Sequence, residues 1–223
     1  MASSASITII DYGSGNLHSI SKALMRLGAD VLVSGRPDDI AAARKLVLPG
    51  VGHFGDAMGE LHKRGLVQPI RTYAASQRPF LGVCVGLQLL MEASEEAPGV
   101  EGLGIIPGAC QRFHNRPGMK VPHMGWNRVN IRRRCPILTT RPIASNAPGN
   151  TTNAQLDDSP WFYFVHSYFA VPTDPRVVAG SCHYGEDFAA VLWQDNVQAT
   201  QFHPEKSQNA GLSLLSNFVE QPC

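Results

Sequence analysis

The chain has 223 residues, enough for one large α/β domain with a substantial buried core or for two small domains. Its 19 Lys and Arg residues balance 18 Asp and Glu residues, so the net charge of +1 leaves no surplus to attract nucleic acid or an anionic membrane. Charged residues make up 17% of the chain, against roughly 25% in an average globular protein, which favours a surface that a partner partly covers.

The N-terminal segment Met1–Ser6 lacks the basic flank and the apolar stretch of a secretory signal peptide. No apolar run elsewhere approaches the roughly 18 residues that a membrane-spanning helix needs. We therefore expect a cytoplasmic protein without a membrane segment.

Short apolar runs alternate with helical patterns in the N-terminal half of the chain. Strands are predicted at Ile7–Ile10, Val31–Val33, Leu46–Leu48 and Pro79–Val83. Helices are predicted at Leu17–Leu27, Asp38–Arg44 and Val85–Glu92. This alternation is typical of a mostly parallel, doubly wound α/β sheet, because a helix that follows a strand packs back onto the sheet in a right-handed crossover.

The pattern changes after Gly104, where strand-like segments follow one another without long helices between them. Strands are predicted at Trp161–Val165, Val177–His183, Ala189–Trp193 and Val197–Phe202, and a closing helix is predicted around Leu212, Leu215 and Phe218. We predict that these strands form an antiparallel extension of the sheet and that residues 1–223 form a single domain. The polar segment Arg141–Pro160 is interpreted as a surface loop of that domain.

The segment Gly82-Val83-Cys84-Val85-Gly86 joins a predicted strand to a predicted helix and has the G-x-C-x-G pattern of a nucleophile elbow. The glycines permit a sharp turn that exposes the sulfur of Cys84. The N–H of Val85 and the start of the helix then supply positive potential for a thiolate and for a developing oxyanion. A single cysteine is more often a structural core residue, but the elbow favours a nucleophile here.

His203 and Glu205 flank Pro204 at the end of the last strand-rich region. In an extended chain this spacing places both side chains on one side. A histidine can take the proton of a thiol and return it to a leaving amine, and a carboxylate on its other nitrogen orients the ring. The same pair also arises by chance on solvated strands, so its assignment depends on the elbow.

The segment Pro49-Gly50-Val51-Gly52 follows the third predicted strand at the same edge of the sheet as Cys84. Its backbone amides could supply a second oxyanion donor opposite Val85. The segment could equally be an ordinary turn between a strand and a helix, and the residues alone leave both interpretations open.

The cysteine pattern argues against disulfides and metal ligation. The five cysteines are an odd number and show neither paired C-x-x-C spacing nor a Cys/His pattern typical of a metal site. The turn Gly13-Ser14-Gly15 lacks the third glycine of a dinucleotide-binding motif, since His18 occupies that place. We therefore expect reduced thiols, no metal and no cofactor.

Taken in order, these motifs resemble those of class I glutamine amidotransferases. More narrowly, the chain resembles the family of glutaminase subunits of imidazole glycerol phosphate synthase. The segments that carry this narrower resemblance are Asp11-Tyr12-Gly13-Ser14-Gly15-Asn16-Leu17, Val121-Pro122-His123-Met124-Gly125-Trp126-Asn127, Tyr163-Phe164-Val165-His166-Ser167-Tyr168 and Phe202-His203-Pro204-Glu205-Lys206-Ser207.

The resemblance implies a class I glutamine amidotransferase-like fold and a role for each motif. It implies that Cys84, His203 and Glu205 form a catalytic triad. It implies an oxyanion hole at Val51, Gly52 and Val85, and glutamine contacts from Gln88, Glu96, Ser167 and Tyr168. It also implies a heterodimer with a (β/α)8-barrel cyclase, through whose core ammonia reaches a nucleotide in histidine biosynthesis. The matching interface positions are Asn16, Trp126, Asn127, Tyr163 and Lys206.

Two other hypotheses compete with this interpretation. A stand-alone cysteine hydrolase could use the same elbow, although Tyr163 and Lys206 match positions of a partner interface. A non-catalytic regulatory module could retain the motifs as relics, although Cys84, His203 and Glu205 are all intact. The segment Arg141–Pro160 is longer and more polar than the family pattern, which leaves its role open.

Overall fold

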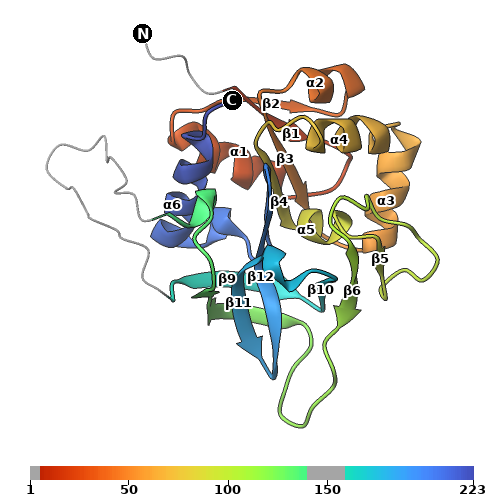
Figure 1. Ribbon diagram of the computed structural model, residues 1–223, viewed down its shortest axis with the longest axis vertical. Coiled ribbons are helices and arrows are strands. Elements are labelled where there is room, and N and C mark those ends of the chain that lie inside the picture. The colour runs from red at the N-terminus through yellow and green to blue at the C-terminus, as the bar shows by residue number, and fades with distance from the viewer. Residues whose placement is uncertain (1–5, 140–158) are drawn as a thin grey trace, which may run out of the picture.

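The computed structural model describes residues 6–139 and 159–223, and its centre is a set of parallel strands (Figure 1). These are β1 (Ser6–Ile10), β2 (Asp30–Ser34), β3 (Lys45–Gly50) and β4 (Phe80–Cys84), in the order β2-β1-β3-β4. β3 and β4 are buried along their whole length, as expected for parallel strands covered on both faces, whereas the edge strand β2 is partly exposed. The predicted parallel sheet is confirmed.

Helices cover both faces of this sheet. α1 (Leu17–Arg26) and α6 (Gln208–Val219) lie on one face, and α2 (Pro37–Ala42), α3 (Phe54–Lys63) and α4 (Val67–Ala74) lie on the other (Figure 1). α5 (Val85–Leu89) follows β4 and ends earlier than the predicted Glu92. No helix among the described residues is both long and apolar enough to cross a membrane.

The same sheet continues with strands from the C-terminal half. β13 (Val197–Thr200), β12 (Glu186–Gln194), β11 (Val178–Tyr184) and β8 (Asn130–Ile131) complete the order β2-β1-β3-β4-β13-β12-β11-β8. The expected antiparallel extension begins at β12, because β13 runs parallel to β4. β13 therefore brings the segment after Thr200 to the same sheet edge as the segment after β4.

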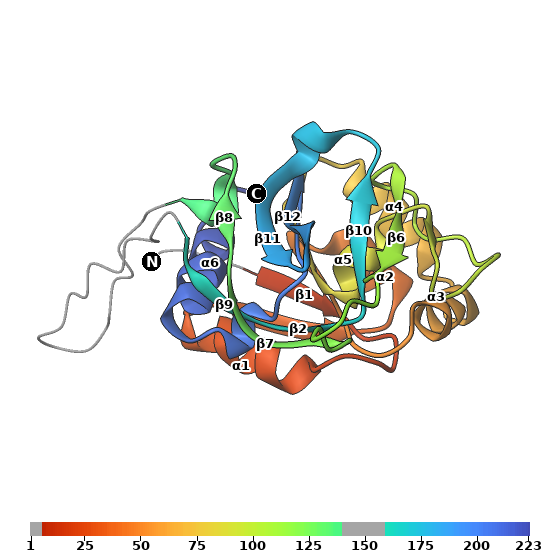
Figure 2. The same ribbon diagram turned by 90° about the horizontal axis from the view of Figure 1, so that it is seen from below.

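Two smaller sheets complete the fold. One contains β10 (Tyr168–Pro172), β6 (Gly108–Arg112) and β5 (Ala93–Ser94), and the other is a ribbon of β7 (His123–Arg128) and β9 (Trp161–His166). Figure 2 shows β7 and β9 side by side. The prediction that Trp161–Val165 extends the large sheet is therefore wrong. β9 alternates buried and partly exposed residues and pairs with β7, which has the same alternation.

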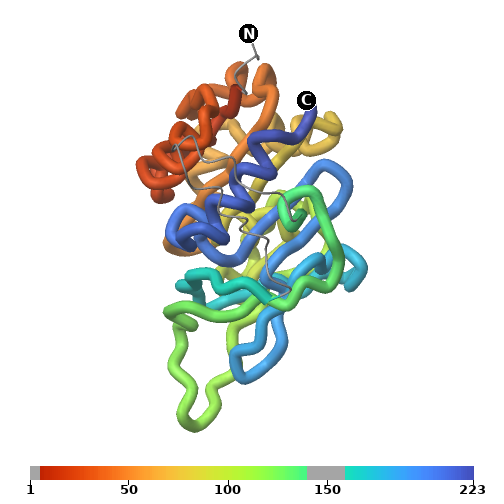
Figure 3. The backbone as a smooth tube through the Cα atoms, turned by 90° about the vertical axis from the view of Figure 1, so that its left-hand side faces the viewer, coloured from red at the N-terminus to blue at the C-terminus, as the bar shows by residue number. Residues whose placement is uncertain are grey.

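Short 3₁₀ helices at Pro136–Leu138, Pro175–Val177 and Pro204–Lys206 connect several of these elements. The connection between β6 and β7 projects at the end of the molecule opposite to the C-terminus (Figure 3). Most of the predicted loop Arg141–Pro160 lies outside the described residues, and only Ser159 and Pro160 fall within them. That interpretation and the single-domain assignment remain predictions.

Candidate active site

Cys84 ends β4 directly before α5, at a sharp turn of the backbone. Its φ of 55° and ψ of −110° lie in a region that residues other than glycine rarely adopt. A Cβ atom at Gly86 would lie 1.9 Å from the carbonyl oxygen of Leu48, and one at Gly82 would lie 3.0 Å from that of Gly86. The turn therefore has room only for glycine at position 86, and it holds Cys84 in the strained geometry typical of a nucleophile elbow.

A cavity of about 270 Å³ opens above the sulfur of Cys84. The predicted residues that line it are Val51, Gly52, Cys84, Val85, Gln88, Glu96, Ser167, Tyr168 and His203. Two larger hollows, of about 440 and 460 Å³, lie elsewhere on the described surface and include neither Cys84 nor His203. The smaller cavity is the one that holds the candidate chemistry.

His203 and Glu205 meet by a different route from the one that the sequence suggested. His203 is extended, but Pro204–Lys206 forms a 3₁₀ turn instead of continuing the strand. The turn brings the carboxylate Oε1 of Glu205 to 3.0 Å from Nδ1 of His203, and each side chain is only 2% exposed. Nε2 of His203, on the other side of the ring, has no hydrogen-bond partner among the described residues. It is therefore free to exchange a proton in the cavity.

The charge of the His203 ring depends on its neighbours. Burial alone lowers the pKa of His203, but interactions with Cys84 and Glu205 outweigh burial and raise it to about 10. At neutral pH the ring is therefore an imidazolium. The Nε2 side of this ring faces the cavity that contains the sulfur of Cys84, where its proton can be given to a leaving group.

The segment that follows β3 lies opposite this pair. Gly50 pairs in register with Cys84, and both Val51 and Gly52 line the cavity. Gly52 has a φ of +91°, which glycine adopts without strain. The Oγ of Ser14 donates a hydrogen bond to the carbonyl oxygen of Val51 (2.8 Å), which ties this turn to the loop after β1.

The residues expected to contact glutamine come from separate elements. Gln88 lies on α5, and its Nε2 donates to the carbonyl oxygen of Tyr168 at 2.9 Å. Glu96 accepts a hydrogen bond from the N–H of Phe54 at the start of α3 (2.8 Å). Ser167 lies between β9 and β10 and reaches the same cavity.

Three polar residues near the cavity were missed by the sequence analysis. Gln201 is fully buried and touches both Cys84 and Gln88. His166 lines the cavity and accepts or donates a hydrogen bond with the neighbouring ring of His123 (3.1 Å). The sequence contains no local sign of these contacts, because strands and loops far apart in the chain bring the side chains together.

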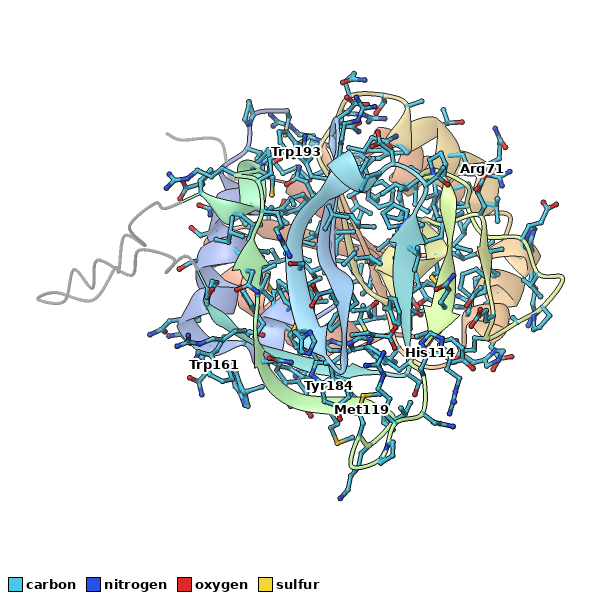
Figure 4. The ribbon with its side chains drawn as sticks, turned by 60° about the horizontal axis from the view of Figure 1, so that its bottom comes forward. Arg71, His114, Met119, Trp161, Tyr184 and Trp193 are labelled. Atoms are coloured by element: carbon cyan, nitrogen blue, oxygen red, sulfur yellow. The ribbon has the colours of Figure 1, made fainter. Side chains whose placement is uncertain are left out.

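The residues predicted at a partner interface separate into two groups. Trp126 and Tyr163 pair across the outer face of the β7–β9 ribbon, with ring centroids 6.1 Å apart, and the Nζ of Lys206 lies 5.9 Å from the ring of Tyr163. The same face exposes Met124 and Trp161, and Trp161 lies at the periphery of the molecule (Figure 4).

Asn127 and Asn16 lie differently. Asn127 is on the inner side of the ribbon, where its Nδ2 donates to the carbonyl oxygen of His183 (2.9 Å). Asn16 lines a very small cavity beside His203 and Glu205. The apolar outer face of the ribbon, without these two residues, is the part best suited to docking.

Comparisons with known proteins agree with this geometry. The family description "Glutamine amidotransferase class-I" matches residues 8–221. The imidazole glycerol phosphate synthase subunit HisH of Thermosynechococcus vestitus is 50% identical over 219 residues, which cover 97% of each chain. The protein of the same name from Syntrophotalea carbinolica is 48% identical over 220 residues, covering 95% of this chain and 98% of that one.

Solved structures share the fold at much lower identity. PurLQS from Thermotoga maritima superposes with a TM-score of 0.71 at 17% identity, covering 96% of this chain and 97% of that one. A solved glutamine amidotransferase superposes with a TM-score of 0.66, also at 17% identity, covering 92% and 94% of the two chains. These matches establish the architecture.

Proposed function

Since the chain belongs to the class I glutamine amidotransferases, we propose that Cys84, His203 and Glu205 are its catalytic triad. The chain is the glutaminase subunit of imidazole glycerol phosphate synthase, an enzyme of histidine biosynthesis. The observation that carries the triad assignment is a single cavity. Cys84 and His203 line it together with Gln88, Glu96, Ser167 and Tyr168. Glu205 contacts Nδ1 of His203, the ring nitrogen on the side away from Nε2.

The triad divides the hydrolysis of glutamine into two steps. The Cys84 thiolate attacks the carbon of the side-chain amide, and the His203 imidazolium gives its proton to the departing nitrogen, which leaves as ammonia. The product is a γ-glutamyl thioester. His203 then takes a proton from water, which attacks the thioester and releases glutamate and the thiolate. Glu205 orients the ring and stabilises its positive charge throughout.

Backbone amides stabilise the oxyanion in both steps. Val85 begins α5, so its N–H has no acceptor within that helix. The turn at Val51 and Gly52 provides the second donor from the opposite side of the cavity. A missing oxyanion donor lowers turnover by about 10² to 10³, so the conformation of this turn can control the rate.

Charge and hydrogen bonding favour a bound glutamine in the rest of the cavity. The Glu96 carboxylate attracts the α-ammonium group of the substrate. Gln88, Ser167 and Tyr168 supply hydrogen-bonding groups around the remaining backbone atoms of the amino acid. Such contacts position the substrate amide against the sulfur.

The partner is a cyclase subunit, and we propose that it is a (β/α)8 barrel that docks on the outer face of the β7–β9 ribbon. Exposed aromatic and apolar side chains on this face support the assignment, because aromatic residues are typical anchors of protein interfaces. β9 is also bonded to the catalytic base, since the N–H of His203 donates to the carbonyl oxygen of Tyr163 (3.0 Å). A partner that docks on Tyr163 can therefore affect the position of the His203 backbone directly.

An assay of glutamine turnover tests this function under three conditions. The chain alone should hydrolyse glutamine slowly, the chain with its cyclase faster, and the complex with the cyclase's nucleotide fastest. The physical reason is that docking and nucleotide binding favour the turn conformation that completes the oxyanion hole. High turnover by the chain alone would instead support a stand-alone hydrolase, and no turnover under any condition would support a non-catalytic module.

A further inference from the structure

Gln201 lies in the loop after β13, directly behind the nucleophile. Its side chain is fully buried between Cys84 and Gln88. Nε2 of Gln201 lies 3.9 Å from the Sγ of Cys84, within hydrogen-bonding range for sulfur, and Oε1 lies 3.3 Å from Nε2 of Gln88. A buried amide in contact with a reactive sulfur needs a chemical explanation.

Neighbouring groups determine which end of the Gln201 amide faces the sulfur. The carbonyl oxygen of Tyr168 can only accept, so the Gln88 atom 2.9 Å from it must be the NH₂ group. The same NH₂ group meets Gln201, which must therefore present its oxygen to Gln88. The NH₂ group of Gln201 consequently points at Cys84.

A donor at this place changes the balance between thiol and thiolate. The carbonyl oxygen of Val165, 4.0 Å from the sulfur, is an acceptor and suits the protonated thiol. The Gln201 N–H has the opposite preference, because a hydrogen bond to a charged acceptor is stronger than one to a neutral acceptor. The bond would stabilise the sulfur before attack and again when the thioester releases it.

We propose that Gln201 is a further catalytic residue, whose side-chain N–H stabilises the Cys84 thiolate and whose orientation is held by Gln88. The proposal rests on the proposed role of Cys84 as the nucleophile. It gives Gln88 a second task, that of a positioning residue, in addition to its expected contact with glutamine.

The test is the pH dependence of Cys84 alkylation by iodoacetamide in the isolated full-length chain. The chain carries Cys223→Ser, because Cys223 is exposed. The other four cysteines are buried, and of these only Cys84 lines the cavity. Adding Cys84→Ala should abolish the labelling and so confirm its site. The test variants are Gln201→Met and Gln201→Glu. The matched control is Gln198→Met, which changes a glutamine that is 1% exposed and bonds Asn196 and Gln221 instead of Cys84.

We expect Gln201→Met to move the midpoint of the profile up by about one pH unit, and therefore to lower the alkylation rate about tenfold at pH values below the parent midpoint. Gln201→Glu should move the midpoint further, because a carboxylate repels the thiolate. Gln198→Met should leave the profile unchanged. Profiles of both Gln201 variants that coincide with the parent profile would overturn the proposal.

Thermal unfolding of each variant checks that it is folded. If Gln201→Met does not fold, Gln201→Leu replaces it in the test, because leucine also lacks the N–H donor and carries no charge. The assay contains neither glutamine nor cyclase. The effect of Gln201 on Cys84 alkylation can therefore be measured even if the glutaminase assay shows no activity. Conversely, an unchanged alkylation profile does not contradict the glutaminase function.

Discussion

At the scale of single residues, the triad members are held by different kinds of interaction. Cys84 is held by backbone packing, since the tightly packed elbow fixes its backbone at a positive φ. His203 is held by hydrogen bonds at both of its backbone polar groups: its N–H donates to the carbonyl oxygen of Tyr163, and its own carbonyl oxygen accepts from the Oγ of Ser207 (2.6 Å). Ser207 in turn accepts from the N–H of Tyr163 (3.0 Å), so the base and β9 form one bonded unit.

Replacing the nucleophile should abolish glutamine hydrolysis without unfolding the protein. Cys84→Ala removes the only atom that can form the thioester, and the smaller side chain fits the same space. Turnover by the cyclase complex should fall at least about a thousandfold, while the melting temperature changes little. A variant that keeps more activity than this would show that another group attacks the amide.

The two partners of the nucleophile should differ in importance. His203→Ala removes the proton carrier in both steps, whereas Glu205→Gln keeps a hydrogen bond to the ring and loses only the negative charge. Steady-state kinetics of the active complex should therefore show a greater loss of kcat for His203→Ala. Equal losses in the two variants would contradict the assigned roles.

At the scale of secondary structure elements, the β4–α5 elbow depends on close approach of two strands and a helix. Gly86 packs so tightly that a Cβ would collide with the carbonyl oxygen of Leu48 in β3. The turn of β3 has a similar constraint, because a Cβ at Gly50 would lie 2.8 Å from the backbone nitrogen of Gly86. A substitution at Gly50 therefore disturbs packing as well as any motion of the turn. Gly52 has open space around its Cβ position, but its φ of +91° would strain any other residue there.

Two glycines in helices provide a matched test of this packing. Gly86→Ala should lower the free energy of unfolding by about 2 to 4 kcal/mol, because the backbone of β3 must shift. Gly59→Ala, inside α3 with no atom within 4 Å of the new Cβ, should instead raise it by about 1 kcal/mol through helix propensity. Denaturant unfolding of the two variants measures both changes, and a loss of similar size at Gly59 would show that Ala itself is the cause.

At the scale of the whole molecule, a pair of neutral histidines links the β7–β9 ribbon to the aromatic core beside the cavity. The ring of His123 stacks on those of Phe164 and Tyr184, with centroids 4.9 and 4.1 Å apart, and Tyr184 lies near the tip of the β11–β12 hairpin (Figure 4). Burial lowers the pKa of His123 to about 4. The pKa of His166 is lowered to about 3, and burial is again the main cause. Both rings are uncharged in the folded protein at neutral pH.

These shifts predict that acid destabilises the fold. An unfolded histidine titrates near 6.5, so below that pH the unfolded chain binds more protons than the folded chain. Between pH 7 and pH 5 the free energy of unfolding should fall, with a limiting slope of about 1.4 kcal/mol per pH unit for each ring. His203 has the opposite shift, so its contribution is complete below pH 6.5 and is lost as the pH rises toward 10.

Urea unfolding at several pH values between 5 and 7 measures this dependence. His123→Asn should reduce the slope, because one shifted group is removed. A free energy of unfolding that does not change over this range would show that the buried rings do not titrate as described.

Local patterns in the sequence were sufficient for the parallel sheet and for the elbow at Cys84. They also paired His203 with Glu205, although a 3₁₀ turn and not an extended chain brings the two side chains together. Each depends on residues close together in the chain: a β-branched run before a helical period, a glycine on each side of a nucleophile, or two side chains separated by one proline. Such features need no knowledge of what packs against them.

Contacts between distant segments were decided by the tertiary structure. The partner of β9, the parallel direction of β13 and the inward position of Asn127 depend on which strands meet, and strand pairing is set by burial across the whole sheet. The proposed chemical role of Gln201 also depends on contacts between distant segments. A glutamine after a strand has no special local pattern, and it became a candidate donor to Cys84 only because β13 lies beside β4 and α5 supplies Gln88 to orient the amide.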